Sequence, residues 1–300
     1  MDQLLWSQIS DIGPQARFQQ AMAYDIDRDR AVLFSGRIPI RDNHGTPTEQ
    51  LGNDTWEFDA TAWAQVADTG PPPRSEFSMC YDARRRKTVL YGGGAAATKF
   101  QDTWEWDGAL WTQVAESGPP PFGGPLAYDA AHGYVLMFCL ASTQANAPNG
   151  STWAWNGSEW TQLDDVGAGS GYGVMAYDGT SRSVILSTDA TSAAGASPTF
   201  SWTGSSWNQI GDLGPRSAMA GAGMAFDGKE LLLYLGATQT WSWNGNAWIE
   251  RQDMGPSHRI GFSIVGDIKR QRCVLFGGQE AVDSPSDTWV LRRIPQTTQP

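Results

Sequence analysis

At 300 residues, the chain is long enough for two ordinary domains or for one large all-β domain. Its 15 Trp, 34 Gly and 17 Pro, with 18% charged residues, are typical of a turn-rich β protein and exclude a disordered chain. The formal net charge of -11 argues against a general electrostatic surface for nucleic acid or an anionic membrane, because such surfaces need clustered Lys and Arg.

The N-terminus and the cysteines indicate a compartment. Met1-Asp2-Gln3 lacks the basic start and apolar run of a signal peptide, and no stretch approaches the roughly 18 consecutive apolar residues of a membrane span. The chain has an odd number of Cys, and all of them lie in apolar strand patterns: Cys80, Cys139 and Cys273. A free Cys in such a pattern behaves as a small hydrophobe. We therefore expect a cytoplasmic protein.

A short motif, Thr followed by an aromatic residue, recurs six times along the chain. The aromatic positions are Trp56, Trp104, Trp153, Phe200, Trp241 and Trp289. Their spacings of 48, 49, 47, 41 and 48 residues are close to the blade period of a β-propeller, about 50 residues.

The second repeat shows four extended runs, here named strands a to d: 77–81, 88–91, 103–106 and 111–114. Strands c and d are joined by Asp107-Gly108, a dipeptide that favours a tight hairpin. The sequence therefore predicts an all-β, six-bladed propeller of four-stranded antiparallel blades. The expected blades span about 15–67, 72–115, 121–164, 170–211, 216–250 and 259–293, the last completed by 3–9.

The completion by 3–9 follows from the strand d tryptophans, which are Trp63, Trp111, Trp160, Trp207 and Trp248. The last blade has none of its own. Leu4-Leu5-Trp6-Ser7-Gln8-Ile9 has the pattern of a strand d, so the N-terminal strand should close the ring and pair two edges that would otherwise be exposed.

This pattern resembles the Kelch family over nearly the whole chain. The resemblance rests on the Gly pairs after strand b, Gly92-Gly93 and Gly277-Gly278, and on the aromatic residues of strands c and d. Blades three to five depart from it, with Phe138-Cys139, Ser187-Thr188 and Leu235-Gly236 in place of the Gly pair. The family includes protein-interaction modules and enzymes, so the resemblance implies a fold but leaves the function open.

Strand a is expected to line the central channel. One set of alternate residues is apolar and should face the core between blades: Met22, Met79, Leu126, Met175, Met224 and Ile264. The intervening small residues should face the channel: Ala23, Cys80, Ala127, Ala176, Ala225 and Val265.

On the N-terminal side of each strand a, the same alternating positions hold polar and cationic residues, which should lie together at one mouth of the channel. Arg17, Arg74 and Arg259 come from three adjacent blades, and we expect them to be partly exposed. The candidate ligand-binding set is Arg17, Gln19, Arg74, Glu76, Tyr172, Arg259, His44 and His258. The predicted function is binding of a small anionic molecule or an acidic peptide by a monomer that binds neither nucleic acid nor membrane.

The alternative is a non-redox enzyme, such as an isomerase, cyclase or lyase, in the same pocket. Glu76 and Tyr172 are its candidate catalytic residues. No metal or cofactor is expected, since the three His form no recognisable ligand set. The Asp once per blade at the a–b turn, such as Asp25 and Asp82, is interpreted as a turn former.

Overall fold

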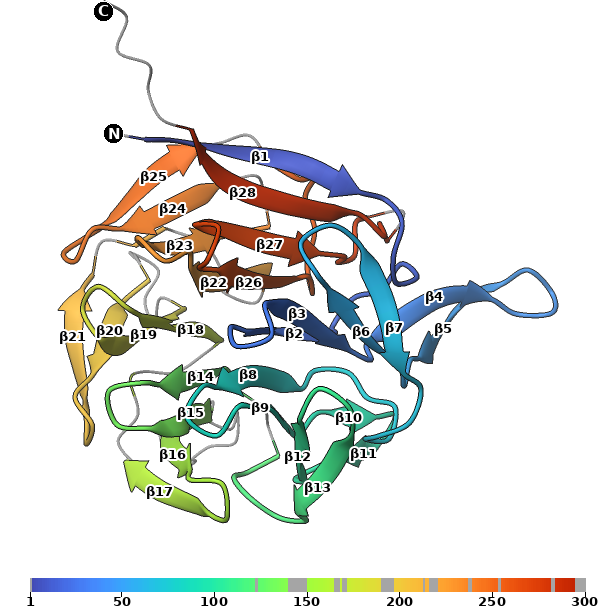
Figure 1. Ribbon diagram of the computed structural model, residues 1–300, viewed down its shortest axis with the longest axis horizontal. Helices are drawn as coiled ribbons and strands as arrows, with labels where there is room; N and C mark the ends of the chain where they lie inside the picture. The colour runs from blue at the N-terminus through green and yellow to red at the C-terminus, as the bar shows by residue number, and fades with distance from the viewer. Residues whose placement is uncertain are drawn as a thin grey trace, which may run out of the picture.

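The computed structural model describes residues 2–121, 124–139, 150–164, 168, 172–189, 197–212, 214–215, 221–236, 239–252, 255–281 and 284–294. Six four-stranded antiparallel sheets stand around a central axis (Figure 1), which confirms the predicted six-bladed β-propeller. In the described residues, no helix is long and apolar enough to cross a membrane.

Each blade runs from the innermost strand a to the outermost strand d. Blade one contains β2 (Ala21–Asp25), β3 (Arg30–Phe34), β6 (Thr55–Phe58) and β7 (Trp63–Ala67). Blade two contains β8 (Ser78–Asp82), β9 (Lys87–Tyr91), β12 (Thr103–Trp106) and β13 (Trp111–Ala115). Blade three contains β14 (Leu126–Asp129), β15 (Tyr134–Cys139), β16 (Ser151–Trp155) and β17 (Trp160–Asp164).

The remaining blades follow the same order. Blade four contains β18 (Gly173–Asp178), β19 (Ser183–Thr188), β20 (Thr199–Trp202) and β21 (Trp207–Gly211). Blade five contains β22 (Gly223–Phe226), β23 (Leu231–Tyr234), β24 (Thr240–Trp243) and β25 (Trp248–Gln252). Blade six contains β26 (Ser263–Asp267), β27 (Arg272–Phe276), β28 (Thr288–Ile294) and β1 (Gln3–Ser10).

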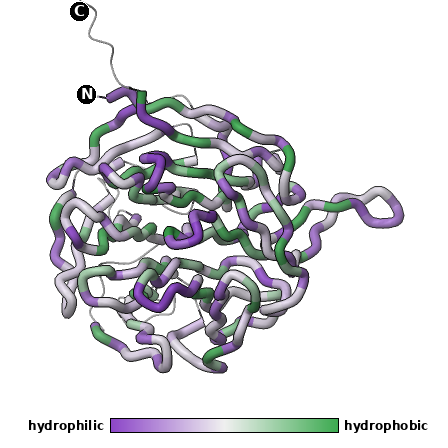
Figure 2. The backbone as a smooth tube through the Cα atoms, in the orientation of Figure 1, coloured by the Kyte–Doolittle hydropathy of each residue, from purple (hydrophilic) through white to green (hydrophobic). Residues whose placement is uncertain are grey.

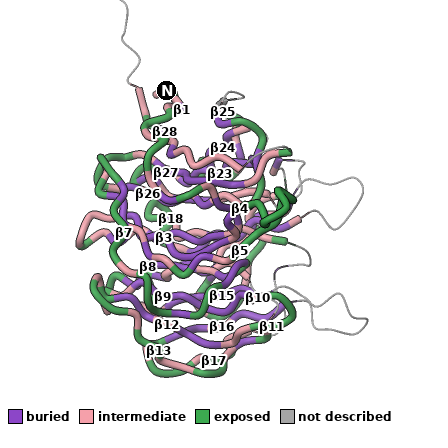
Figure 3. The backbone as a smooth tube through the Cα atoms, turned by 90° about the vertical axis from the view of Figure 1, so that its right-hand side faces the viewer, coloured by how far each residue is buried: buried purple, intermediate pink, exposed green. Residues whose placement is uncertain are grey.

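Two short ribbons extend from the b–c connections. One pairs β4 (Arg37–Arg41) with β5 (Pro47–Leu51) and projects from the rim of the propeller (Figure 1). The other pairs β10 (Gly94–Ala95) with β11 (Thr98–Lys99). Figure 3 shows that the buried residues lie mainly in the blade strands, and that the β4–β5 ribbon is largely exposed.

The N-terminal strand closes the ring as expected. β1 pairs antiparallel with β28, and Trp6 lies opposite Leu291 in that register. The Trp6 indole Nε1 donates a 2.9 Å hydrogen bond to Thr240 Oγ1 in blade five. All six strand d tryptophans bond in this way to the motif threonine of the preceding blade; the others are Trp63, Trp111, Trp160, Trp207 and Trp248. The strand d Trp and the motif Thr therefore recur together along the chain because each such pair joins two neighbouring blades.

Candidate functional site

A cavity of about 520 Å³ occupies the central channel. All six strands a line it, together with turn residues that follow them at one end, such as Ile26, Ala83 and Ala130. Among the described residues that line it, none is Asp, Glu, Lys, Arg or His. The described wall of the cavity is thus uncharged and mostly apolar, and the a–b turns border one of its ends.

The wall of the cavity differs from the expected alternation, because both sets of strand a residues line it. The small residues also contact the next blade: Ala23 packs in one cluster with Met79, and Cys80 in one cluster with Leu126. Strand a presents its edge to the channel and its two faces to the neighbouring blades. Small side chains on one face leave room for the large side chain opposite, which is how six strands fit around a narrow axis.

Five aromatic side chains, one from each of five blades, border the cavity near the a–b turns: Tyr24, Tyr81, Tyr128, Tyr177 and Phe226. The Tyr24 hydroxyl lies 2.5 Å from Asp29 Oδ1 and 2.9 Å from Asp267 Oδ1, and the Tyr81 hydroxyl donates to Asp27. Burial and these carboxylates raise the pKa of both phenols, so they stay neutral. The rings are therefore held in place as neutral walls of the pocket.

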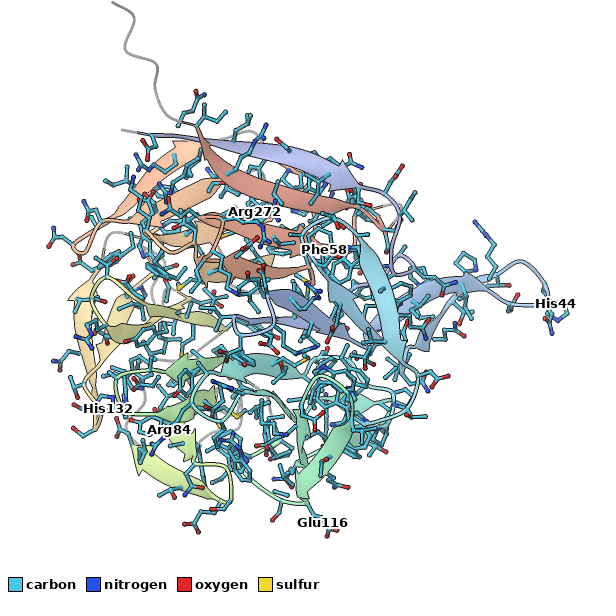
Figure 4. All side chains as sticks on the ribbon, in the orientation of Figure 1. His44, Phe58, Arg84, Glu116, His132 and Arg272 are labelled. Atoms are coloured by element: carbon cyan, nitrogen blue, oxygen red, sulfur yellow. The ribbon has the colours of Figure 1, made fainter. Side chains whose placement is uncertain are left out.

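The predicted turn role of the aspartates is borne out by their hydrogen bonds. Asp25 accepts from the Arg28 backbone N–H, and Asp82 accepts from the backbone N–H groups of Arg84 and Arg85. Hydrophilic residues gather at these turns (Figure 2), and Arg84 and His132 are labelled on them in Figure 4. The carboxylates hold the turns and do not face the channel as a ring of free acids.

The expected exposure of Arg17, Arg74 and Arg259 is wrong, since all three side chains are fully buried. Arg74 Nη1 and Nη2 donate hydrogen bonds of 2.6 and 2.9 Å to the two carboxylate oxygens of Asp102. Its Nη1 and Nε also donate to the carbonyls of Gly92 and Pro72. Arg17 and Arg259 repeat this arrangement on Asp54 and Asp287. The guanidinium donors are used within the fold, which removes the basis for an anion site there.

Each of these aspartates also accepts a hydrogen bond from a tryptophan, giving three Arg-Asp-Trp triads. The Trp104 Nε1 to Asp102 Oδ2 distance is 2.7 Å, and Trp56 and Trp289 act likewise on Asp54 and Asp287. Blades three to five lack both the Arg and the Asp. The sequence signal that could have revealed the triad is this joint occurrence of Arg and Asp in blades one, two and six.

Gln19 and Glu76 lie next to one another, just beyond the end of the cavity that is opposite the a–b turns. Gln19 Nε2 donates to Glu76 Oε1 at 3.1 Å, and Lys99 Nζ lies 3.2 Å from Glu76 Oε2. Both residues have left-handed backbone, with φ of 55° and 59°, where blade six has Gly261. Tyr172 is 59% exposed, and its backbone N–H donates to Asp189. The structure joins Gln19 with Glu76, and neither side chain is hydrogen-bonded to Tyr172.

The two candidate histidines are both exposed but do not share a site. His44 is at the tip of the β4–β5 ribbon, far from the channel (Figure 4). His258 precedes the buried Arg259. None of the eight predicted site residues lines the cavity. Within the part of the chain that the structure describes, no three His, Cys, Asp or Glu side chains gather as a metal site.

Comparison with known proteins identifies the fold. No family model matches the chain, and no curated protein matches it. A solved structure titled "Structure of YjhT" superposes with a TM-score of 0.69 at 12% sequence identity, covering 96% of this chain and 100% of that one. At this identity the likeness shows the propeller fold alone.

Proposed function

We propose that this protein is a binding propeller that receives a small, predominantly apolar ligand in its central channel. The observation that carries the proposal is the 520 Å³ uncharged cavity, walled by methionine, alanine and tyrosine side chains. Ligand pockets of this kind have volumes of about 300–1,000 Å³ and are mostly apolar, with a few polar groups for orientation. The anionic ligand expected from the sequence loses its support, because its arginines are paired inside the fold.

We infer further that the chain is a Kelch-type propeller. The support is the backbone at the Gly pair of blade two, where Gly92 and Gly93 have φ of 72° and 82°. A Cβ on Gly93 would lie 2.7 Å from the Ser75 carbonyl oxygen. Only glycine suits that position, so the pair that defines the resemblance also has a structural reason here.

A second candidate is the non-redox enzyme, with Glu76 as its acid or base. Left-handed backbone at a residue other than glycine costs about 1–3 kcal/mol and is concentrated at functional sites. Glu76 and Gln19 both carry it, as do seven other non-glycine residues among those described, and the side chains of these two are hydrogen-bonded to each other. This observation favours a polar site at their end of the channel, separate from the apolar cavity.

The a–b turn of blade three offers a matched pair of variants to test the channel. Ala130 is exposed and lines the cavity, whereas Ala131 is exposed in the same turn and does not line it. Ala130→Trp should weaken binding of benzofuran, a small apolar probe, by roughly tenfold or more, because the indole covers the opening. Binding is measured by ligand-detected NMR titration.

Two controls separate the candidate sites. Ala131→Trp and Glu76→Gln should leave the affinity for benzofuran unchanged. If Glu76→Gln weakens the binding of benzofuran and Ala130→Trp does not, the probe binds at the polar end of the channel. If the unchanged protein does not bind benzofuran, the channel is not an apolar ligand pocket.

A further inference from the structure

The channel cavity is long and narrow. In blade one, every residue from Gln20 to Tyr24 lines it, and Ile26 of the following turn lines it too. A β-strand rises about 3.3 Å per residue, so the cavity follows this strand for about 13 Å. The volume of 520 Å³ spread over that length gives a cross-section of roughly 40 Å² and a width of roughly 7 Å. Since neighbouring extended chains lie about 4.8 Å apart, the channel has room for one extended chain.

The middle of the cavity is apolar on every side. Two successive residues of each strand a form this zone, and all of them have hydrocarbon or sulfur side chains: Met22-Ala23, Met79-Cys80, Leu126-Ala127, Met175-Ala176, Met224-Ala225 and Ile264-Val265. Methionine is flexible and polarizable, so these walls can adapt to a flexible ligand. A ligand that passes through this zone meets no strong hydrogen-bonding side chain and must itself be apolar there.

Polar side chains lie toward the two ends of the cavity. Ser78 and Ser263 line the end opposite the a–b turns, and Gln19 and Glu76 lie just beyond it. At the other end, the Tyr81 hydroxyl donates to an aspartate of the blade one turn. A polar group at the end of a ligand therefore finds polar surroundings, whereas a polar group in its middle does not.

From this shape and polarity we infer the chemical class of the ligand: an unbranched aliphatic chain with a polar group at one end. This inference rests on the proposed channel function and deepens it. Each methylene buried along the channel adds a similar increment of affinity, so a longer chain binds more tightly until it fills the channel. A bulky body with the same number of carbons must push apart packed side chains, which weakens its binding.

1-Hexanol, 1-octanol and cyclooctanol test the inference, because they separate chain length from carbon number. We expect 1-octanol to bind the unchanged protein roughly fifteenfold more tightly than 1-hexanol, about fourfold for each added methylene. It should also bind at least about tenfold more tightly than cyclooctanol, whose ring is wider than an extended chain. The affinities, with that of benzofuran, are measured by ligand-detected NMR titration.

Variants of Ala176 test whether the chain lies in the channel, because this half-buried residue lines the cavity beside Met175. Ala176→Phe narrows the channel and should remove most of the gain in affinity from 1-hexanol to 1-octanol. Ala176→Val is a milder change in the same direction, and it serves if the Phe variant does not fold. Ala131→Phe adds the same ring at an exposed turn position outside the cavity wall and should leave the gain unchanged.

The outcomes separate this inference from the channel function. Equal binding of 1-octanol and cyclooctanol by a protein that binds benzofuran would overturn the inference and leave the channel function standing. A gain from 1-hexanol to 1-octanol that persists in both Ala176 variants would place the chain outside the channel and overturn the inference too. If neither the alcohols nor benzofuran binds, the channel function itself is wrong.

Discussion

Arg74 shows how one residue type supports two opposite predictions. As an arginine near the end of a channel-lining strand, it predicts an anion site. In the structure it is fully buried, and Asp102, Gly92 and Pro72 take four of its hydrogen bonds. The alternation of side chains along strand a predicts the direction in which Arg74 points, but it does not predict which residue pairs with it. That partner, Asp102, precedes strand c of the same blade, 28 residues away.

Asp102→Asn should destabilise the protein by about 3–5 kcal/mol, because it leaves the Arg74 guanidinium buried without a countercharge. Burial acts to raise the pKa of Asp102, but Arg74 and Trp104 outweigh it and the pKa is lowered. The stabilisation by the carboxylate is therefore fully present above the unfolded pKa of about 3.9 and is lost as the pH falls through the lowered folded value.

The measurement is the free energy of unfolding in urea at several pH values. Asp102→Asn should lose stability at neutral pH and show a shallower decline in acid than the unchanged protein. Lys99→Ala, an exposed change on the neighbouring β10–β11 ribbon, is the control and should alter stability by less than about 0.5 kcal/mol. A change as small for Asp102→Asn would refute the structural role of the triad.

At the scale of elements, the sequence predicts more than at the scale of residues. Each strand column is repeated six times, so the blade strands and the closing role of Trp6 can be recognised by comparison along the chain. The hydrogen bonds from the strand d tryptophans to the threonines of the preceding blade show why the two columns recur together. Divergent columns carry less signal, as the loss of the Arg and Asp in blades three to five shows.

Deletion of residues 1–9 should lower the melting temperature by at least about 5 °C. The deletion exposes the edge of β28 and removes the buried Trp6, and loss of a buried Trp alone costs about 3–5 kcal/mol. Gln8→Ala, an exposed change on β1, should have little effect on the melting temperature. A deletion variant that melts within a degree or two of the full chain would contradict closure by β1.

At the scale of the whole molecule, the sequence predicts the ring but not the pocket. The cavity depends on how six edges of strand a meet around one axis, and no single repeat contains that geometry. Gln20, which lines this cavity, stands at a repeat position where the second repeat has Phe77, so no periodic signal marks it. The mouth expected to bind the ligand holds Gln19 and Glu76, whereas the cavity ends one residue short of Gln19, at Gln20.

The central claim is that the channel cavity binds a small apolar ligand. The most direct measurement is the NMR spectrum of methionine ε-methyl groups during titration with benzofuran. Met22, Met79, Met175 and Met224 line the cavity, whereas Met137 is buried in blade three away from it. The account predicts saturable shifts of the four cavity methyl signals and none of Met137. Unchanged cavity methyl signals at saturating probe would contradict it.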